Sequence, residues 1–406
     1  MEKSLYGLRI SPKKWNEKFS EAIENLGLEN DLHEPCSFTW RKSGLIAFII
    51  LYVDDMLMGG NCPEKLEEIK KHLCSKFKMK DLGEPRMFLG MRITRNRQNK
   101  IITIDQSEYI EKVLERFNMK ESKPKDTPMV TRQVQKRMTQ IAQNKETYTP
   151  NVPYREAIGS LLYLAGATRP DISYAINILS RSQTKPTLRN WDDVKRVLRY
   201  LRGTTNVGLT FRGKSDTLEA HTDSSHRDWL DSSSTGGYII SLFGDTIGWR
   251  SHKQNYATLS TCQSEYLAMS ESCSELISLD KATRNILGKT FYPITIWCDN
   301  ISAKENTEKE GSHKLKDFDD PIEVIQENLR YREETGKRKH LGESHGDYIK
   351  YLVLKCEKIK VKYVNTKENI TDIMTKPLEF KSHHYLTRKI LNIENRLSLR
   401  PNSDPS

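Results

Sequence analysis

Two adjacent aspartates, Asp54 and Asp55, interrupt the otherwise apolar stretch ILYVDDML at residues 50–57. Aspartate is common in solvent-facing turns, and a turn is the simplest explanation of the pair. The apolar flanks favour a more specific arrangement, a β-hairpin whose tip emerges from a core and places Leu51 and Val53 away from Tyr52. Carboxylates held rigidly on such a tip are natural ligands of Mg²⁺, which prefers hard oxygen donors.

Four further acids, in the second half of the chain, lie beside or within short apolar segments. These segments are AHTDSSHRDW, LSTCQSEYLAMS, IWCDNISA and ENITDIMTKPL. Asp223 follows a short predicted strand, Glu265 opens a helix and Asp299 ends a strand, while Asp372 lies in the last amphipathic segment. Each acid alone has an ordinary explanation as a turn residue or a helix-start residue. Two divalent ions about 4 Å apart need carboxylates from several elements, so we expect the four to converge, with Asp223 and Asp299 on neighbouring parallel strands.

The spacing of apolar residues predicts the elements that position these acids. Helices are expected at 15–27, 63–77, 107–117, 154–168, 171–182 and 190–204, and strands at 45–53, 86–93, 100–105, 217–225, 236–243 and 245–251. Residues 119–152 are polar, basic and proline-spaced, which predicts a linker or a loosely packed excursion. Residues 304–350 are densely charged and poor in apolar anchors, which predicts a helix with exposed ends or an insertion.

The composition limits the function classes. With 65 lysines and arginines against 54 acids, the 406-residue chain has a formal charge of +11, which favours a polyanionic partner such as nucleic acid or reflects a solubilising surface. No apolar run is long enough for a membrane span, and the first residues lack the apolar core of a signal peptide. Seven cysteines without C-x-x-C spacing indicate reduced thiols in an intracellular protein.

A basic helix offers one candidate nucleic-acid contact. Arg196, Arg199 and Arg202 lie with Tyr200 along one predicted helix. The cations could neutralise phosphates while Tyr200 stacks on a base or packs inward. A solvated helical face explains the same residues equally well.

The first half of the sequence resembles a known family. YVDD on a hairpin is similar to the catalytic motif of reverse transcriptases, and five blocks in order resemble the Pol polyprotein of copia-type retrotransposons: LYGLRISPKKW, FKMKDLGEPRMFLGM, DQSEYIEKVLERFNM, YREAIGSLLYLAGATRPDISYA and VKRVLRYLRGT. The resemblance implies that Asp54 is the main metal ligand for nucleotidyl transfer and Asp55 its support. It also implies a third aspartate on a strand before YGL, whereas this sequence starts at MEKSLYGL, and Ile10 stands where many relatives have glutamine. DNA synthesis by this chain alone is therefore not expected.

The second half resembles the RNase H domain of the same elements. SSTGGY, SHKQNYATLST and SEYLA are the matching pieces. The resemblance implies that Asp223, Glu265, Asp299 and Asp372 bind Mg²⁺ or Mn²⁺ and hydrolyse RNA in RNA–DNA hybrids. Residues 318–343 match poorly and indicate an insertion, so His340 and His345 are better explained as surface histidines than as catalytic ones.

The alternation of predicted helices and strands indicates an α/β multidomain chain, and the resemblance implies a partial polymerase palm, a helical thumb and connection, and a C-terminal RNase H-like mixed-sheet domain. The predicted ranges are 1–118 for palm and thumb, 119–152 for the linker, 153–212 for the helical connection, 216–380 for the RNase H-like domain and 381–406 for a C-terminal tail. The predicted partners are RNA–DNA hybrid, primer–template and other Pol segments, with no membrane. We expect an intracellular location, in the cytoplasm, in virus-like particles or in the nucleus. The alternative is an inactive or host-retained fragment that only binds nucleic acid.

Overall fold

The computed structural model describes residues 8–30, 34–131, 151–228, 232–255, 258–308, 349 and 351–393. These residues form two compact units, each described here by itself. Unit 1 contains residues 8–89 and 277–290, and unit 2 contains the other described residues. The predicted insertion at 318–343, with His340 and His345, lies outside the described residues. None of the described helices is long and apolar enough to cross a lipid bilayer.

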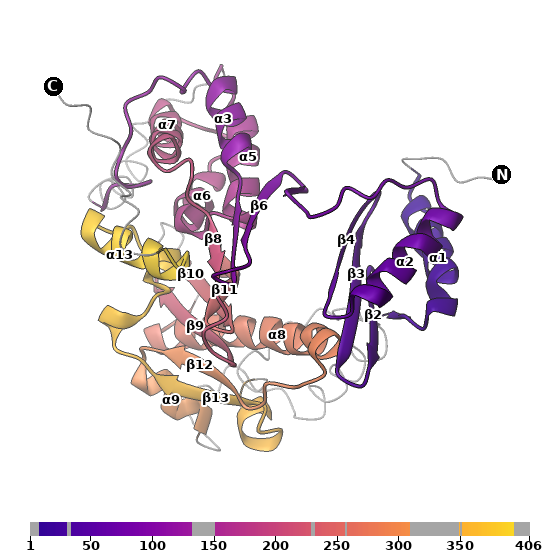
Figure 1. Ribbon diagram of the computed structural model, residues 1–406. Helices are drawn as coiled ribbons and strands as arrows, with labels where there is room; N and C mark the ends of the chain where they lie inside the picture. Colours follow the sequence, from indigo (N-terminus) through magenta and orange to yellow (C-terminus); the bar gives the residue numbers. More distant parts are fainter. Residues whose placement is uncertain are drawn as a thin grey trace. The chain divides into compact units, whose positions relative to one another are not determined.

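Unit 1 is an antiparallel sheet of order β1-β2-β3-β4 with two helices on one face (Figure 1). Its elements are α1 (Ser11–Ile23), η1 (Glu24–Leu26), β1 (Glu29–Asn30), β2 (Ser37–Lys42), β3 (Leu45–Tyr52), β4 (Asp55–Gly60), α2 (Pro63–Lys76) and the short β5 (Met87–Phe88). Alternate β3 residues Ala47, Ile49 and Leu51 are buried against both helices, as the pleat of a strand requires. The chain leaves η1 through Gly27, whose positive φ of 68° favours glycine.

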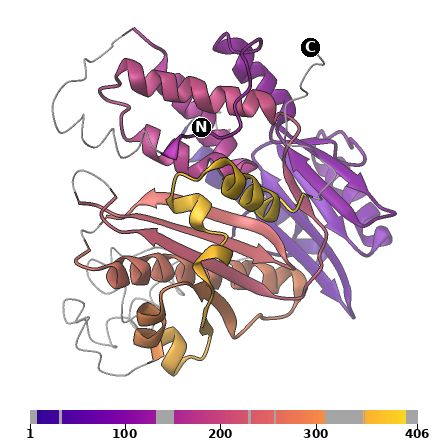
Figure 2. The same ribbon diagram turned by 90° about the vertical axis from the view of Figure 1, so that its left-hand side faces the viewer.

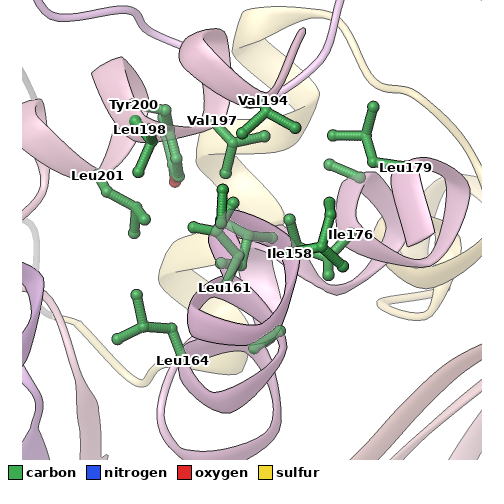
Figure 3. Packing of buried hydrophobic residues seen from close by; sticks show 14 of the residues in the cluster. Ile158, Leu161, Leu164, Ile176, Leu179, Val194, Val197, Leu198, Tyr200 and Leu201 are labelled. Carbon is green, nitrogen blue, oxygen red and sulfur yellow. The ribbon is translucent and has the colours of Figure 1, made fainter. Parts of the chain in front are cut away.

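Unit 2 begins with a β-hairpin and a helical cluster. These elements are β6 (Met91–Asn96), β7 (Ile101–Asp105), α3 (Ser107–Arg116), α5 (Tyr154–Ala167), η2 (Pro170–Ile172), α6 (Ser173–Ser180), α7 (Leu188–Gly203) and β8 (Leu209–Phe211), which pairs with β7. Figure 3 shows apolar side chains of α5, α6 and α7 meeting in one core, including Leu161, Ile176 and Val197. The helical spacing of these residues predicts this arrangement, because one face of each helix must be buried.

The rest of unit 2 is built on a five-stranded mixed sheet of order β11-β10-β9-β12-β13. Its elements are β9 (Leu218–Ser225), β10 (Thr235–Leu242), β11 (Asp245–Lys253), α8 (Thr261–Leu287, entering unit 1 at residue 277), β12 (Ile294–Cys298), α9 (Ile301–Glu308), η4 (Tyr351–Lys355), β13 (Ile359–Tyr363), η5 (Thr366–Glu368), α12 (Asp372–Thr375) and α13 (Phe380–Ile390). Strands β9, β10 and β11 are antiparallel, whereas β12 runs parallel to both β9 and β13. Figure 2 shows α13 in front of this sheet and α8 behind it.

A fully buried ion pair joins three parts of unit 2. The Arg169 guanidinium donates to both carboxylate oxygens of Asp171, at 2.9 and 2.7 Å, and also to the Thr204 side chain and carbonyl. The Tyr200 hydroxyl of α7 donates to Asp171 at 2.7 Å, and the His383 ring of α13 contacts the Asp171 carbonyl at 3.1 Å. A buried charge is tolerated only when it is paired and hydrogen-bonded, and this pair meets both conditions.

Two predicted ranges need correction. Residues 119–131 of the predicted linker are held against α7, because Arg196, Arg199 and Arg202 donate hydrogen bonds to Thr127, Lys123 and Lys120. The predicted tail from residue 381 begins instead with helix α13, whose buried Leu386 and Ile390 join the core beside β10. Polar composition conceals the linker's packing, because most of these contacts are made by backbone carbonyls.

Asp171→Asn should lower the free energy of unfolding of unit 2 by about 3–5 kcal/mol, because the Arg169 charge would stay buried without its partner. Asp192→Asn on α7 is the matched control, because Asp192 pairs with Lys195 at an exposed site. Its expected effect is below about 1 kcal/mol. Urea denaturation followed by circular dichroism measures both, and equal effects of the two variants would contradict the role given to the buried pair.

Candidate metal centre

Parallel pairing of β9 and β12 brings Asp223 and Asp299 together. The register pairs Ala220 with Ile296 and His221 with Trp297, so Asp223 and Asp299 follow two residues later at the same end of the sheet. Asp223 lies inside β9, close to the predicted strand at 217–225, and Asp299 directly follows β12. The side-by-side placement expected from the sequence is therefore found.

Short helix α12 brings Asp372 to the same point. Asp372 is its first residue, and the preceding Asn369 anchors the segment by donating to the Thr222 carbonyl at 2.9 Å. Gly237 of β10 permits the close approach of α12, because an added Cβ would lie only 2.6 Å from the Met374 side chain. A carboxylate oxygen from each of Asp223, Asp299 and Asp372 lies within 4.8 Å of the other two.

Glu265 reaches the centre from α8. It lies in the second turn of this helix, not at its start as the sequence analysis expects, because α8 begins at Thr261. Its Oε1 accepts hydrogen bonds from the Ser224 backbone N–H at 3.0 Å and from the Ser224 hydroxyl at 2.9 Å. Its Oε2 is buried and has no hydrogen-bond partner among the residues that the structure describes. An unpaired buried carboxylate oxygen is costly without a donor or a cation.

A second group of ligand atoms overlaps the first. One oxygen from each of Glu265 and Asp299 and the Sγ of Cys298 lie within 4.8 Å of one another, so Asp299 belongs to both groups. All four acids predicted from the sequence are thus brought together. Cys298 was missed, because C-x-x-C spacing was the only pattern taken to indicate a cysteine ligand; its position directly before Asp299 was the available signal.

Burial and like charge disfavour ionisation in this centre. Burial raises the pKa of Asp223 to about 7, and Asp372 and Asp299 add to this rise, whereas Lys376 and the Thr375 hydroxyl oppose it. Burial also raises the pKa of Glu265 well above its usual range, helped by Asp223 and then by Asp299. A cation among these groups would favour their ionised forms.

The Lys376 ammonium group lies at one side of the centre. Lys376 was not identified in the sequence analysis. Its Nζ lies 2.7 Å from an Asp372 oxygen and 3.2 Å from Asp223 Oδ2. Burial alone would lower the pKa of Lys376, but the carboxylates of Asp223 and Asp372 outweigh it and raise this pKa. Its spacing of four residues from Asp372 was the available signal, since such residues share a helical face.

The donor set fits divalent cations. Hard ions such as Mg²⁺ and Mn²⁺ take carboxylate oxygens, and the centre offers four acids, one with an unpartnered buried oxygen. Two ions about 4 Å apart would offset the burial and like charge that raise the pKa values of Asp223 and Glu265. The residues therefore fit a site of one or two divalent ions.

Asp54 and Asp55 lie elsewhere, at the exposed tip of the β3–β4 hairpin in unit 1. Tyr52 pairs with Asp55, which leaves a two-residue turn with Val53 at a φ of 54°. Leu51 is 4% exposed and Tyr52 57% exposed, as alternation predicts, but Val53 is 47% exposed because it belongs to the turn and not to the strand. Neither aspartate joins a cluster of three or more candidate metal ligands among the described residues.

The strained turn is held in place by a neighbouring helix. A positive φ is rare for a β-branched residue such as Val53, and such strain is often found at functional sites. The Trp15 indole of α1 donates a 2.8 Å hydrogen bond to the Val53 carbonyl. The candidate nucleic-acid helix is α7. Its Arg199 and Arg202 donate hydrogen bonds to residues 119–131, and its Tyr200 is buried.

In the absence of divalent ions, stability should fall as the pH rises from about 4 to about 7. The folded pKa of Asp223 is raised above its unfolded value of about 3.9, so the folded state binds the proton more tightly. The stabilisation is complete below the unfolded pKa and is lost as the pH rises through about 7.

Melting temperatures measured in EDTA across this range, compared with Asp223→Asn, test the expectation. The parent chain should lose stability relative to the variant, because the amide that replaces the carboxyl group does not titrate. Added Mn²⁺ should remove much of the parent's loss, because a cation favours the ionised carboxylates. Parallel curves for parent and variant in EDTA would contradict the role of Asp223.

Comparison with known proteins identifies the family. A family described as reverse transcriptase (RNA-dependent DNA polymerase) matches residues 1–131. The chain is 34% identical over 93% of its length to the retrovirus-related Pol polyprotein from transposon TNT 1-94 of Nicotiana tabacum, of which it covers 27%. It is 31% identical over 67% of its length to the putative transposon Ty5-1 protein of Saccharomyces cerevisiae, of which it covers 87%.

Among solved structures, a foamy viral protease–reverse transcriptase in complex with dsDNA is similar over 89% of this chain and 60% of that chain. Its sequence identity is 14% and its TM-score 0.23, too low to support an assignment. The chain spans about a quarter of the length of the Pol polyproteins that it matches. With the transposon relatives taken together, the chain belongs to the Pol family of copia-type retrotransposons.

Proposed function

We propose that this chain is the reverse transcriptase and RNase H region of a copia-type Pol polyprotein, and that its metal centre hydrolyses RNA in RNA–DNA hybrids. The observation that carries the proposal is the convergence of Asp223, Glu265, Asp299 and Asp372 at one end of a mixed sheet. The sheet order β11-β10-β9-β12-β13 supports the RNase H-like part of the proposal. The net charge of +11 suits a polyanionic substrate.

Each residue of the centre has a defined task in this proposal. Asp223, Asp299, Asp372 and Glu265 would hold Mg²⁺ or Mn²⁺, which would activate a water molecule and stabilise the charge on the scissile phosphate. Asp299, shared by both ligand groups, would link the two ion positions. Ser224 fixes the direction of the Glu265 carboxylate, which prepares its free oxygen for a cation.

Two neighbours orient Asp223. The Thr375 hydroxyl donates a hydrogen bond to Asp223 Oδ2, and Lys376 partly neutralises the same carboxylate. Both residues belong to the segment that carries Asp372. One short segment thus supplies a ligand, a hydroxyl donor and a positive charge to the centre.

The hairpin tip is proposed as the polymerase contribution of the chain. Asp54 and Asp55 would bind the ions for nucleotidyl transfer, beside the strained Val53 turn. Two-ion transfer needs carboxylates from separate elements, and the described residues bring no third acid into a metal-binding group with this pair. Another part of the Pol polyprotein would have to supply it.

Asp299→Asn should reduce cleavage of a labelled RNA–DNA hybrid in Mn²⁺ or Mg²⁺ by about 100-fold or more, because it removes the ligand shared by both groups. Hybrid binding, measured by fluorescence anisotropy at low salt, should remain. Asp216→Asn is the matched control, because Asp216 is exposed and precedes β9.

Two outcomes would contradict the proposal. Unchanged cleavage in Asp299→Asn would show that the centre is not the catalyst. Binding without cleavage by the parent chain would favour the fragment that only binds nucleic acid.

The purified chain should not extend a DNA primer on a poly-rA template with Mg²⁺ or Mn²⁺, because the hairpin offers only two acids. Incorporation of labelled dTTP measures this. Extension that is lost in Asp54→Asn and kept in Asp216→Asn would overturn the expectation and show that these two carboxylates suffice.

A further inference from the structure

The corner of the centre formed by Glu265, Cys298 and Asp299 differs from the rest in its donor atoms. The Cys298 thiol and one oxygen from each acid lie within 4.8 Å of one another. Cys298 ends β12 and is fully buried, and the Asn300 backbone N–H donates to its Sγ at 3.4 Å. The thiol therefore belongs to the cluster of ligand atoms, although its burial would otherwise mark it as a core residue.

Within the described ranges, the part of the centre formed by Glu265, Cys298 and Asp299 lacks an ammonium group like the one that neutralises Asp223 and Asp372. Lys376 contacts Asp223 and Asp372, whereas no lysine or arginine among the described residues forms an ion pair with Glu265 or Asp299. Glu265 is 5% exposed, and its Oε2 accepts no hydrogen bond from the described part of the chain. A cation bound by Glu265 and Asp299 would supply the missing partner of this oxygen.

We propose that Glu265, Cys298 and Asp299 form a second, thiophilic metal site that takes Zn²⁺ or Cd²⁺. Thiolate sulfur selects such soft or borderline ions, whereas Mg²⁺ takes oxygen ligands. Binding breaks the S–H bond, forms a metal–sulfur bond and releases the proton to solvent, with no change of oxidation state. Three protein ligands leave the fourth position of a tetrahedral ion to water.

The geometry needs only a small adjustment. Metal–ligand distances of about 2.0–2.3 Å place the ligands of a tetrahedral ion about 3.5 Å apart. Atoms now within 4.8 Å of one another reach this spacing by side-chain shifts of about 1 Å. Glu265 and Asp299 would then be unavailable to Mg²⁺ or Mn²⁺. The ion would thus inhibit hydrolysis, a consequence that rests on the proposed function, whereas binding itself does not.

Cadmium titration of the full chain tests the site through the ultraviolet absorption of a sulfur–cadmium bond. The chain used for the titration, called the parent in this experiment, carries serine at every cysteine except Cys273 and Cys298. The other five are replaced because they could bind Cd²⁺ themselves: four are at least partly exposed, and Cys62 lies beside Glu64. The expected result is one equivalent of bound Cd²⁺ with the absorption band. Cys298→Ser should remove this band.

Cys273→Ser is the matched control. Cys273 is also fully buried, but it lies eight residues beyond Glu265 on α8, about 12 Å along the helix. Its replacement should leave the band intact. A band that is absent from the parent, persists in Cys298→Ser or disappears in Cys273→Ser would overturn the proposal.

A second variant keeps the proposal falsifiable if Cys298→Ser does not fold. Asp299→Asn retains the thiol and should weaken Cd²⁺ binding by about tenfold or more, since loss of a ligand costs at least as much as loss of its supporting hydrogen bond. Unchanged Cd²⁺ affinity in this variant would overturn the site.

Hydrolysis assays separate this proposal from the proposed function. A cadmium band in a chain that does not cleave hybrid would support the site and reject the hydrolysis. Cleavage in Mg²⁺ without a cadmium band in the parent would support the hydrolysis and reject the thiophilic site. If both hold, Zn²⁺ should inhibit the parent more strongly than it inhibits Cys298→Ser.

Discussion

Four carboxyl groups meet at one end of β9 and β12, where burial and like charge both disfavour the ionised forms of Asp223 and Glu265. The parallel register fixes Asp223 beside Asp299 without any side-chain adjustment, because backbone hydrogen bonds set the positions of both strands. Ser224 and Thr375 donate to the carboxylates, and Lys376 supplies a positive charge on one side. Among the described residues, Glu265 Oε2 has no hydrogen-bond donor, so a cation at this point would supply its partner.

The elements that carry these acids depend on packing some distance from the centre. The segment after Asp372 leads into α13, and α13 is joined through His383 to the buried Arg169–Asp171 pair. Tyr200 of α7 donates to the same Asp171 carboxylate. Because a buried ion pair is sensitive to the loss of either partner, the helical cluster and α13 are stabilised together.

The regular elements and the convergence of the four acids could be predicted from the sequence, for a physical reason. Strand and helix periodicity follows from burying one face, and the carboxyl ends of parallel neighbours must meet, which places Asp223 beside Asp299. Packing that depends on backbone carbonyls, as where Arg199 holds Lys123, leaves no apolar pattern to read. Lys376 and Cys298 were missed because their roles come from three-dimensional proximity and not from residue type or motif spacing.

The hairpin tip and the buried centre differ in how their carboxylates are solvated. Asp54 and Asp55 are exposed, so water solvates their charges, and what the fold supplies is a strained turn at Val53 held by Trp15. At the buried centre the backbone is regular, and the energetic cost lies in desolvated charge. A cation bound at the second site would therefore offset a larger cost than one bound at the first. Binding of a cation at the buried centre would then be coupled to the stability of unit 2.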